Sequence, residues 1–512
     1  MTQKVIMHTP TEKEFLALTK KGNLIPIYKE ISGDLETPVS AYYKVASKSP
    51  YSFLLESVEG EEKVARFSFL SYQPELILET KNNDVKITTL TGKKTKEEKF
   101  KIKTSPLEAI RDILKEYKFV EVKGLPRFCG GLVGFLSYDI VRFFEKLPKL
   151  TRDDLDLPDV LMALTKNIII FDHLNHKIKI VCCVYIEDKS STAEKIKAYQ
   201  RALKTITATT SLLNKPLNAP NPPQKTKRSN LKVTSNFNEQ QFSSIVDRAK
   251  EYIQKGDIIQ IVLSQRFQVD LKANPFYIYR SLRGLNPSPY MYFLNFKDIY
   301  IVGSSPEMLV RCEDGKVETR PIAGTRKRGA NEEEDARLAV DLLQDPKERA
   351  EHIMLVDLGR NDLGRVCERG SVRVKDFMII EKYSHVMHIV SSVVGKLQKD
   401  KDHLDVLTAA FPAGTVSGAP KIRAMEIIEE LEKVSRGPYA GCIGYLSFSG
   451  NLDTCITIRT IVVKGKKAYI QAGAGIVADS VAKTEFQETV NKAKAQIRAI
   501  EIAEGSLDPS SY

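Results

Sequence analysis

Short apolar runs separated by turn residues recur along the whole chain and limit the folds open to it. They include YSFLLESV, ARFSFLSY, PELILET and VKITTL early in the chain and YMYFLNF, IYIVGSS and AYIQAGAGIV later. Others, such as NIIIF and IKIVCCVYI, are far too short to span a membrane, so we expect buried strands. Strands that follow one another without regularly alternating helices indicate antiparallel pairing rather than βαβ units.

Helical patterns lie between these runs. The clearest are PLEAIRDILKEY, STAEKIKAYQRALKTI, NEQQFSSIVDRAKEYIQKGD, APKIRAMEIIEELEKV and EEEDARLAVDLLQDPKERAEHIMLVDLG, the last expected as one helical stretch. The segment LLNKPLNAPNPPQKTKRSN has four prolines and no apolar periodicity, so we expect a mobile surface linker. This pattern predicts two domains, residues 1–228 and 229–512, with the boundary near Arg228.

The chain has 512 residues and a formal net charge of +12. Such an excess of positive charge is compatible with binding to nucleic acid, to a membrane surface or to small anionic substrates. The basic residues are scattered, with no compact block interleaved with aromatics, which favours a solvated surface over nucleic-acid or membrane binding. Seven cysteines without a C-x-x-C pair indicate reduced thiols in the cytoplasm and not a disulfide framework or zinc site. The N-terminal residues lack the apolar stretch of a secretory signal.

Two pairs of glutamates share one spacing. Glu348 and Glu351 lie three residues apart in DPKERAEHIMLVDLGRNDLGRV, and Glu485 and Glu488 do so in AKTEFQETVNKAKAQI. On a helix, residues three apart project from nearly the same face. If the two helices face each other, four carboxylates converge and need a cation, for which oxygen ligands favour Mg2+ over Zn2+. The alternative is a pair of solvated helix faces, because E-x-x-E is common on surface helices.

Polar residues and glycines replace aliphatic residues at several points of the second half. They are Glu307 in GSSPEMLVR, Gly324 and Thr325 in TRPIAGTRKRG, His388 in YSHVMH, Thr415 in FPAGTVSGAPK, Arg459 in CITIRT, and Gly473, Ala474 and Gly475 in QAGAGIV. Glycine-rich turns can direct backbone amides at an anion. An arginine inside an apolar strand is hard to bury unless an anion meets it.

Each of these residues also has a purely structural interpretation. Gly473 and Gly475 can permit a bulge, His388 can be a core histidine with satisfied hydrogen bonds, and Arg459 can pair with a structural Asp. Together they fit one chemistry better. Mg2+, an arginine and backbone amides form a site for a small polyanionic substrate, with His or Glu as proton donor.

The order of these motifs resembles that of the chorismate-utilising enzymes. PIAGT, DPKERAEHIMLVDLGRNDLGRV, VMH, GTVSGAPK, LDTCITIR and AGAGIVADS follow the family's order between about Phe242 and Ala499. The first half, including YSFLLESVEG, resembles the companion domain of anthranilate synthase large subunits, so the resemblance covers nearly the whole chain. It implies an α+β fold of large antiparallel β-sheets packed face to face with helices outside.

The resemblance also implies roles for particular residues. Glu351 and Glu488 are expected to bind Mg2+, with Glu348 and Glu485 lining the same site and acting partly through water. Glu307 and His388 are placed near the hydroxyl that leaves the substrate. Further catalytic candidates are Glu348, Thr415 and Gln260. Substrate contacts are implied for Gly324, Thr325, Tyr439, Arg459, Gly473, Ala474 and Gly475.

Two positions separate the branches of the family. Members that add water resemble one another in having a lysine base where this chain has Gln260, and a glutamine cannot activate water. Aminodeoxychorismate synthases commonly carry a nucleophilic lysine where this chain has Ala323, which cannot form a covalent adduct. The resemblance therefore implies the anthranilate synthase reaction. Ammonia attacks C2 of chorismate, the C4 hydroxyl leaves, and loss of pyruvate gives anthranilate for tryptophan biosynthesis.

Regulation and partners are implied in the same way. A tryptophan feedback site is expected from Leu54, Leu55, Glu56 and Ser57 together with Pro289, Tyr290 and Met291. No cysteine lies in a G-x-C-x-G setting, so ammonia should come from solution or from a separate glutamine amidotransferase subunit. The expected assembly is a hetero-tetramer of two large and two small subunits.

Two other functions remain open at this point. A basic, non-catalytic scaffold protein is one, although it would be expected to lack a Glu pair or Arg459, and both are present. Aminodeoxychorismate synthase is the other, because the lysine is common in that branch rather than universal.

Overall fold

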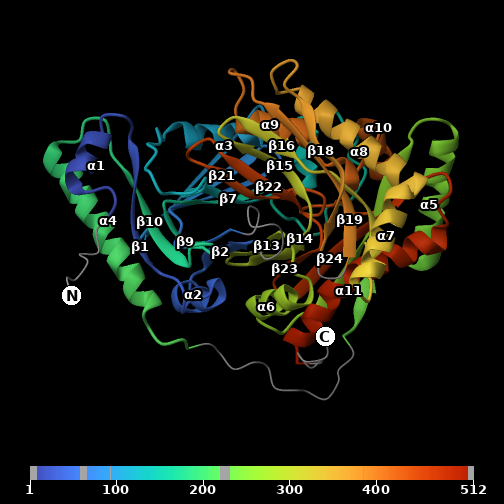
Figure 1. Ribbon diagram of the computed structural model, residues 1–512, viewed down its shortest axis with the longest axis horizontal. Helices are drawn as coiled ribbons and strands as arrows, with labels where there is room; N and C mark the ends of the chain where they lie inside the picture. The colour runs from blue at the N-terminus through green and yellow to red at the C-terminus, as the bar shows by residue number, and fades with distance from the viewer. Residues whose placement is uncertain (1–7, 58–65, 93, 219–230, 384–385, 506–512) are drawn as a thin grey trace.

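A computed structural model describes residues 8–57, 66–92, 94–218, 231–383 and 386–505. Within these residues the strands form two large antiparallel sheets of twelve strands each, with the helices around them (Figure 1). The predicted α+β class of large antiparallel sheets with helices outside is confirmed. In Figure 1, α1 and α4 cover the left flank, while α5, α7, α8 and α11 lie on the right.

The first sheet has its strands in the order β1 Leu24–Ser32, β10 Lys177–Tyr185, β9 Asn167–Asp172, β3 Phe67–Tyr72, β2 Tyr51–Glu56, β13 Tyr290–Phe296, β14 Ile299–Ser305, β23 Thr460–Lys464, β24 Lys467–Ile476, β12 Gln260–Asp270 and β11 Val233–Ser235, with β20 Gly418–Ala419 also on β12. The second has the order β17 Ile322–Lys327, β19 Val386–Lys396, β16 Lys316–Thr319, β15 Met308–Glu313, β22 Leu452–Ile456, β21 Cys442–Ser447, β7 Gly131–Leu136, β8 Val160–Thr165, β4 Leu76–Lys81, β5 Asp84–Thr91 and β6 Lys94–Lys101, with β18 Arg373–Lys382 also on β19.

The described helices are α1 Glu12–Leu18, α2 Pro38–Val45, α3 Pro106–Lys115, α4 Thr192–Leu213, α5 Glu239–Gln254, α6 Pro275–Leu285, α7 Glu332–Gln344, α8 Pro346–Gly364, α9 His403–Ala410, α10 Lys421–Leu431 and α11 Ala482–Ala503, with the short 3-10 helices η1 Tyr138–Phe143 and η2 Gly414–Val416. None of the helices in the described ranges is long and apolar enough to cross a membrane. All seven cysteines are free thiols.

Both sheets take strands from each half of the chain. In the first sheet β2 pairs with β13, with Leu55 opposite Tyr292. In the second, β7 pairs with β21, with Gly134 opposite Gly444. The expected domain boundary near Arg228, and residues 219–230 of the expected linker, lie outside the described residues. Because β2 pairs with β13 and β7 with β21, continuous backbone ladders join the two halves of the chain.

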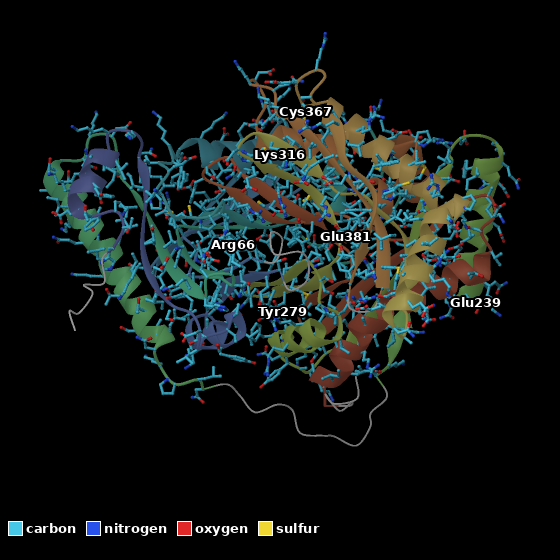
Figure 2. The ribbon with its side chains drawn as sticks, in the orientation of Figure 1. Arg66, Glu239, Tyr279, Lys316, Cys367 and Glu381 are labelled. Atoms are coloured by element: carbon cyan, nitrogen blue, oxygen red, sulfur yellow. The ribbon has the colours of Figure 1, made fainter. Side chains whose placement is uncertain are left out.

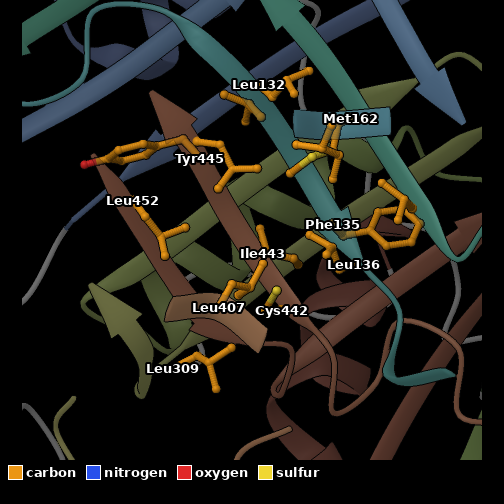
Figure 3. Packing of buried hydrophobic residues seen from close by; sticks show 14 of the residues in the cluster. Leu132, Phe135, Leu136, Met162, Leu309, Leu407, Cys442, Ile443, Tyr445 and Leu452 are labelled. Atoms are coloured by element: carbon orange, nitrogen blue, oxygen red, sulfur yellow. The ribbon is translucent and has the colours of Figure 1, made fainter. Parts of the chain in front are cut away.

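Strand β13 shows why the runs in this chain are apolar throughout instead of alternating. Tyr292 and Leu294 belong to the large hydrophobic core between the two sheets, whereas Met291 and Phe293 belong to a second core beneath the helices. Successive side chains of a strand point to opposite faces. Since both faces of this sheet are covered, every position of β13 favours an apolar residue. Figure 3 shows part of the large core, where residues of β7, β8, β15, β21 and β22 in the second sheet pack near α9.

Two expectations about these elements are wrong. The single helical stretch from EEEDAR to VDLG is two helices, α7 and α8, because Asp345 caps α8 and Pro346 begins it. The Asp345 carboxylate accepts hydrogen bonds from the amides of Lys347 and Glu348, and proline is well tolerated only in the first turn of a helix. Arg459 is not inside a strand but in the turn between β22 and β23, with φ of +52°.

Candidate active site

The expected substrate residues of β17, Gly324 and Thr325, lie close to two expected catalytic residues, His388 of β19 and Glu348 of α8. Gly324 has φ of +72° and occupies an irregularity in the β17–β19 register, a conformation that favours glycine. His388 Nδ1 lies 2.9 Å from the Gly324 carbonyl oxygen and 3.1 Å from Thr325 Oγ1. Because a carbonyl only accepts, Nδ1 carries the proton and Nε2 keeps its lone pair. Burial lowers the pKa of His388, so the ring is neutral at neutral pH.

Glu348 and Glu351 lie on the face of α8 that looks toward these strands. A Cβ on Gly324 would come within 3.1 Å of Glu348 Oε2, so the glycine gives the carboxylate room. Gln260 Nε2, from β12, donates to Glu351 Oε1 at 3.2 Å. The pKa of Glu348 is raised by burial and by the neighbouring Glu351. Glu348 and Glu351 therefore place two carboxyl groups close together at a site that is partly shielded from solvent.

The second glutamate pair lies on the first turns of α11. Burial and the Glu488 carboxylate raise the pKa of Glu485, while the nearby Lys347 lowers it, which places the start of α8 near the start of α11. Glu488 pairs with Lys492 at 2.6 Å. Lys492 Nζ also donates to the Gly473 carbonyl at 3.0 Å. The two glutamate pairs thus flank one region.

The four carboxylates are not gathered into one cluster in this structure, and the expected Mg2+ site of Glu348, Glu351, Glu485 and Glu488 stays a prediction. In the part of the chain that the structure describes, no three Asp, Glu, His or Cys side chains gather closely enough to hold a metal ion. The reason is that Glu351 bonds Gln260 and Glu488 pairs with Lys492. The donor set still fits Mg2+ in its chemistry, because it is all carboxylate oxygen. Burial, and next the neighbouring glutamate of each pair, raise the pKa of Glu348 and Glu485.

Gly473, Ala474 and Gly475 lie in β24, which pairs with β12 without a register shift, so no bulge is present there. The amides of Val262 and Ser264 donate to other groups, Ser417 O and Glu432 Oε1. Their partners Gly475 and Gly473 therefore occupy the non-hydrogen-bonded positions of the ladder, and their amides point away from β12. β23 pairs with β24 only as far as Ile470. The amides of Gly473 and Gly475 thus face an unpaired edge, while that of Ala474 faces β12.

Tyr439 and Arg459 stand at this edge. Burial raises the pKa of Tyr439 to about 12, so its hydroxyl remains a hydrogen-bond donor. A Cβ on Gly473 would lie 2.6 Å from this hydroxyl. Arg459 Nη1 donates to the Lys492 carbonyl at 2.6 Å, and burial lowers the pKa of Arg459. The alternative that Arg459 pairs with a structural Asp finds no such pair among the described contacts, which leaves the guanidinium suited to an anionic ligand.

Glu307, between β14 and β15, is the most strongly perturbed acid of the region. Its side chain is buried, and burial raises its pKa to about 8, against smaller opposing effects of the Thr415 hydroxyl and Lys492. A cavity of about 40 Å3 lies beside Glu307 and Thr415, enough space for a water molecule. Glu307 is therefore protonated at neutral pH and suited to donate a proton.

The structure thus brings the second-half candidates into one region through a chain of contacts. Sequence reasoning missed Lys492, which touches Glu488 and Gly473 and acts on the pKa of Glu307. A signal was available, because Lys492 follows Glu488 by four residues and so lies on the same face of α11.

The residues expected to bind tryptophan line a separate cavity of about 760 Å3. They are Leu55, Glu56, Ser57, Pro289, Tyr290 and Met291. Leu54 does not line it, because it packs in the core beneath the helices on the opposite face of β2. The buried Ser57 hydroxyl has no hydrogen-bond partner in the described ranges. Arg66, on the cavity wall, and Tyr279, which donates to Glu56, lie near the middle of Figure 2.

Charged groups of this cavity are arranged around Asp453 of β22. Its carboxylate accepts from Arg127 Nη2 at 3.0 Å, Arg311 Nε at 3.0 Å and the Tyr290 hydroxyl at 2.9 Å. Phe67, Phe69 and Met291 supply apolar wall. A cavity with aromatic walls and both signs of charge suits an aromatic amino acid.

Comparison with known proteins gives consistent matches. The model of the family described as chorismate binding enzyme matches residues 88–498. Anthranilate synthase component 1 of Acetivibrio thermocellus is 49% identical over 97% of this chain and 99% of its own, and that of Aquifex aeolicus is 50% identical over 97% and 98%. The crystal structure of anthranilate synthase component I from Streptococcus pneumoniae is similar with a TM-score of 0.75 and 39% identity, covering 91% of this chain and 98% of that one.

Packing at the edge of β24 predicts that Gly473 and Gly475 differ in their tolerance of an added Cβ atom. A Cβ at Gly473 meets the hydroxyl of buried Tyr439 and, at 3.0 Å, the Leu263 carbonyl, whereas a Cβ at Gly475 meets only the end of the flexible Gln260 side chain. We expect Gly473→Ala to lower the free energy of unfolding by about 1–3 kcal/mol and Gly475→Ala by less than about 0.5 kcal/mol. Denaturant titration measures both, and equal losses would contradict the packing described.

Proposed function

The chain belongs to the chorismate-binding enzyme family, among its anthranilate synthase component 1 members, and we propose that it converts chorismate and ammonia to anthranilate and pyruvate at the site around Glu307. The observation that carries this proposal is the buried Glu307 carboxyl beside a small cavity, whose pKa of about 8 keeps it protonated at the place where we propose that the hydroxyl leaves. The reaction would be the first step of tryptophan biosynthesis.

In the first chemical step ammonia forms a bond to C2, both ring double bonds shift toward C4, and the C4–O bond breaks. The ammonium group formed at C2 then loses one proton to solvent. The leaving hydroxide takes the Glu307 proton and departs as water, so Glu307 must be reprotonated before the next turnover. We assign the proton to Glu307 and not to His388, because the His388 ring is neutral and its Nδ1 proton is held by the Gly324 carbonyl. Glu348 is partly exposed, which makes it the weaker candidate.

In the second step the amino intermediate loses its C2 proton and the C3–O bond breaks, which releases pyruvate and forms the aromatic ring. The His388 Nε2 lone pair is the base that we propose for this proton, since Nδ1 is fixed as a donor. Arg459, Tyr439 and the outward amides of Gly473 and Gly475 would hold the substrate's carboxylates. Aromatisation makes this step strongly downhill.

Mg2+ would be held by Glu351 and Glu488, with Glu348 and Glu485 acting partly through water. When bound, it would polarise and neutralise a substrate carboxylate. Because Glu351 and Glu488 now contact Gln260 and Lys492, binding would exchange these partners for the ion.

Two residues support amination with pyruvate loss over the related reactions. Gln260 offers an amide, not an amine base, and it is occupied by Glu351. Ala323 is buried in β17 and has no nucleophilic group, which disfavours the covalent route of many aminodeoxychorismate synthases.

The partners follow from the same proposal. A component 1 protein implies a second component, and we propose a glutamine amidotransferase subunit that delivers ammonia, in a hetero-tetramer of two large and two small subunits. We propose a cytoplasmic location, which the seven free thiols support.

Tryptophan is the ligand that we propose for the larger cavity, as a feedback inhibitor. Its ammonium would lie near Asp453, its carboxylate near the unpaired Ser57 hydroxyl, and its indole between the aromatic walls. Since β2 and β13 of this cavity come from opposite halves of the chain, bound tryptophan would favour one arrangement of the sheets.

The raised pKa of Glu307 predicts the pH dependence of catalysis. At a fixed concentration of free ammonia, kcat/KM should fall about tenfold per pH unit above about 8 as the proton is lost, and Glu307→Gln should lose about 10²–10⁴-fold at every pH. The same pKa shift also predicts how stability depends on pH. The pKa of Glu307 in the folded protein is above the ordinary value of 4.5, so the free energy of unfolding that this proton contributes declines as pH rises from 4.5 to about 8. The Gln variant should therefore melt no lower than the parent at alkaline pH, and a variant with full activity would contradict the role of Glu307.

Removal of one carboxylate tests the proposed metal site. Glu351→Gln or Glu488→Gln should abolish turnover at limiting Mg2+ and weaken Mg2+ binding in calorimetry, while the melting curve stays that of a folded protein. Glu501→Gln is the matched control, because Glu501 lies on the same helix about 20 Å from Glu488. Full activity of either variant at limiting Mg2+ would contradict the assignment.

Tryptophan binding can be read directly, because the chain contains no tryptophan of its own. Ser57→Arg would place a cation and a long side chain in a cavity that already contains Arg66, Arg127 and Arg311. We expect the variant to lose at least about tenfold in affinity, measured by tryptophan fluorescence and by inhibition. The exposed Ser47→Arg is the control, and a Ser57→Arg variant as sensitive as the parent would count against this site.

A further inference from the structure

Arg436 and Glu432 form a deeply buried ion pair beside the proposed active site. Each side chain is only 2% exposed, and the two are joined by Nη2 to Oε1 at 2.7 Å and Nε to Oε2 at 2.9 Å. Neither residue is among those expected to contact substrate or metal. Replacing such a pair with apolar groups is often neutral or stabilising, so stability alone does not account for it.

Arg436 joins two elements that carry candidate catalytic residues. Its Nη2 donates to the carbonyl of Val262, on β12, at 2.7 Å, and its Nη1 donates to that of Val416, in η2, at 2.6 Å. Gln260 lies two residues before Val262 on β12, and Thr415 immediately precedes Val416. One planar guanidinium therefore bridges these two segments, in addition to the backbone hydrogen bond from the Val262 amide to the Ser417 carbonyl at 2.9 Å.

The same guanidinium lies against two aromatic rings. It is 4.8 Å from the centre of the Tyr138 ring and 5.5 Å from that of Tyr439, distances typical of cation–π contacts. Tyr439 follows Arg436 by three residues, and its hydroxyl lies against Gly473. Arg436 therefore also supports the ring of a substrate-binding candidate.

Glu432 fixes the guanidinium and adds a contact to β12. Its Oε1 accepts from both the amide and the hydroxyl of Ser264 at 2.8 Å. Ser264 pairs with Gly473 in the β12–β24 ladder, and Gln471 Nε2 donates to its hydroxyl at 2.9 Å. The carboxylate thus extends the network to β24, whose Gly473 and Gly475 amides face the unpaired edge proposed to bind substrate.

We propose that Arg436, held by Glu432, is a positioning residue that sets Gln260, Thr415 and Tyr439 relative to one another for the bound substrate. The inference rests on the proposed function for its catalytic consequence. Arg436 acts through backbone carbonyls and an aromatic ring. A lysine has the same charge but lacks the planar guanidinium with its several N–H donors, so it cannot replace Arg436.

Arg436→Lys is the test, with Arg142→Lys as the matched control. Arg142 pairs with the buried Glu429 of α10, three residues before Glu432, but this pair bonds the segment around Thr151 and no candidate substrate residue. We expect Arg436→Lys to lose about 10²-fold in kcat/KM for chorismate, with kcat reduced as well as KM raised, because small displacements of reacting groups are costly. Arg142→Lys should stay within about threefold of the parent.

Hydrogen exchange gives a second readout that needs no turnover. In Arg436→Lys the amides of residues 260–264 and 414–417 should exchange faster than in the parent, whereas Arg142→Lys should leave them unchanged. The Gly437 amide is left out of this comparison, because it donates to Asp139, which pairs with Arg142. Unchanged exchange at residues 260–264 and 414–417, or kcat/KM of Arg436→Lys within about threefold of the parent, would overturn the proposal. A parent that does not use chorismate would refute the proposed function, and the exchange experiment would still decide the positioning role.

A double variant, Glu432→Gln with Arg436→Met, covers the case in which Arg436→Lys does not fold. Removing both charges avoids an unpaired buried ion, so this variant should fold. Its kcat/KM should remain about 10²-fold below that of the parent, because the guanidinium is still missing. Recovery of parental activity would show that the pair is only structural and would overturn the proposal.

Discussion

Backbone pairing between the two halves of the chain is the constraint on which the rest of this structure depends. β2 pairs with β13 in one sheet and β7 with β21 in the other. The inter-sheet core, the larger cavity and the order of the strands all require these ladders. Because the first sheet runs from β2 and β13 through β14 and β23 to β24 and β12, the cavity strands and the active-site strands belong to one continuous sheet.

A second connection between the two sites runs through β22. Asp453 faces the cavity, and three residues later the amide of Ile456 donates to the Glu307 carbonyl at 3.0 Å. Arg459 follows in the next turn. A ligand that alters the contacts of Asp453 would therefore act on a strand that positions Glu307, the proposed proton donor, and leads to Arg459, the arginine proposed to bind an anion. This would give the proposed feedback inhibition a physical route.

Local patterns in the sequence predicted most strands and helices, because apolar runs and caps depend on neighbouring residues. The strand order was not predictable in this way, since pairing between β2 and β13 depends on distant segments. Local patterns such as the two E-x-x-E pairs marked many of the candidate site residues, and the family resemblance gave them roles. The structure changed their environment in two cases. Glu351 and Glu488 have local partners in place of each other, and Arg459 lies in a turn because the chain reverses between β22 and β23. Arg436 gave no signal, because its role depends on carbonyls far away in the sequence.

The most direct test of the account is product identification with the purified chain, chorismate, Mg2+ and ammonium. The account predicts anthranilate and pyruvate in equal amounts without any added lyase, since one site both aminates the ring and eliminates pyruvate. Accumulation of an amino intermediate that needs a second enzyme to release pyruvate would contradict it and indicate aminodeoxychorismate synthase. Absence of any turnover would contradict the assignment of a catalytic site.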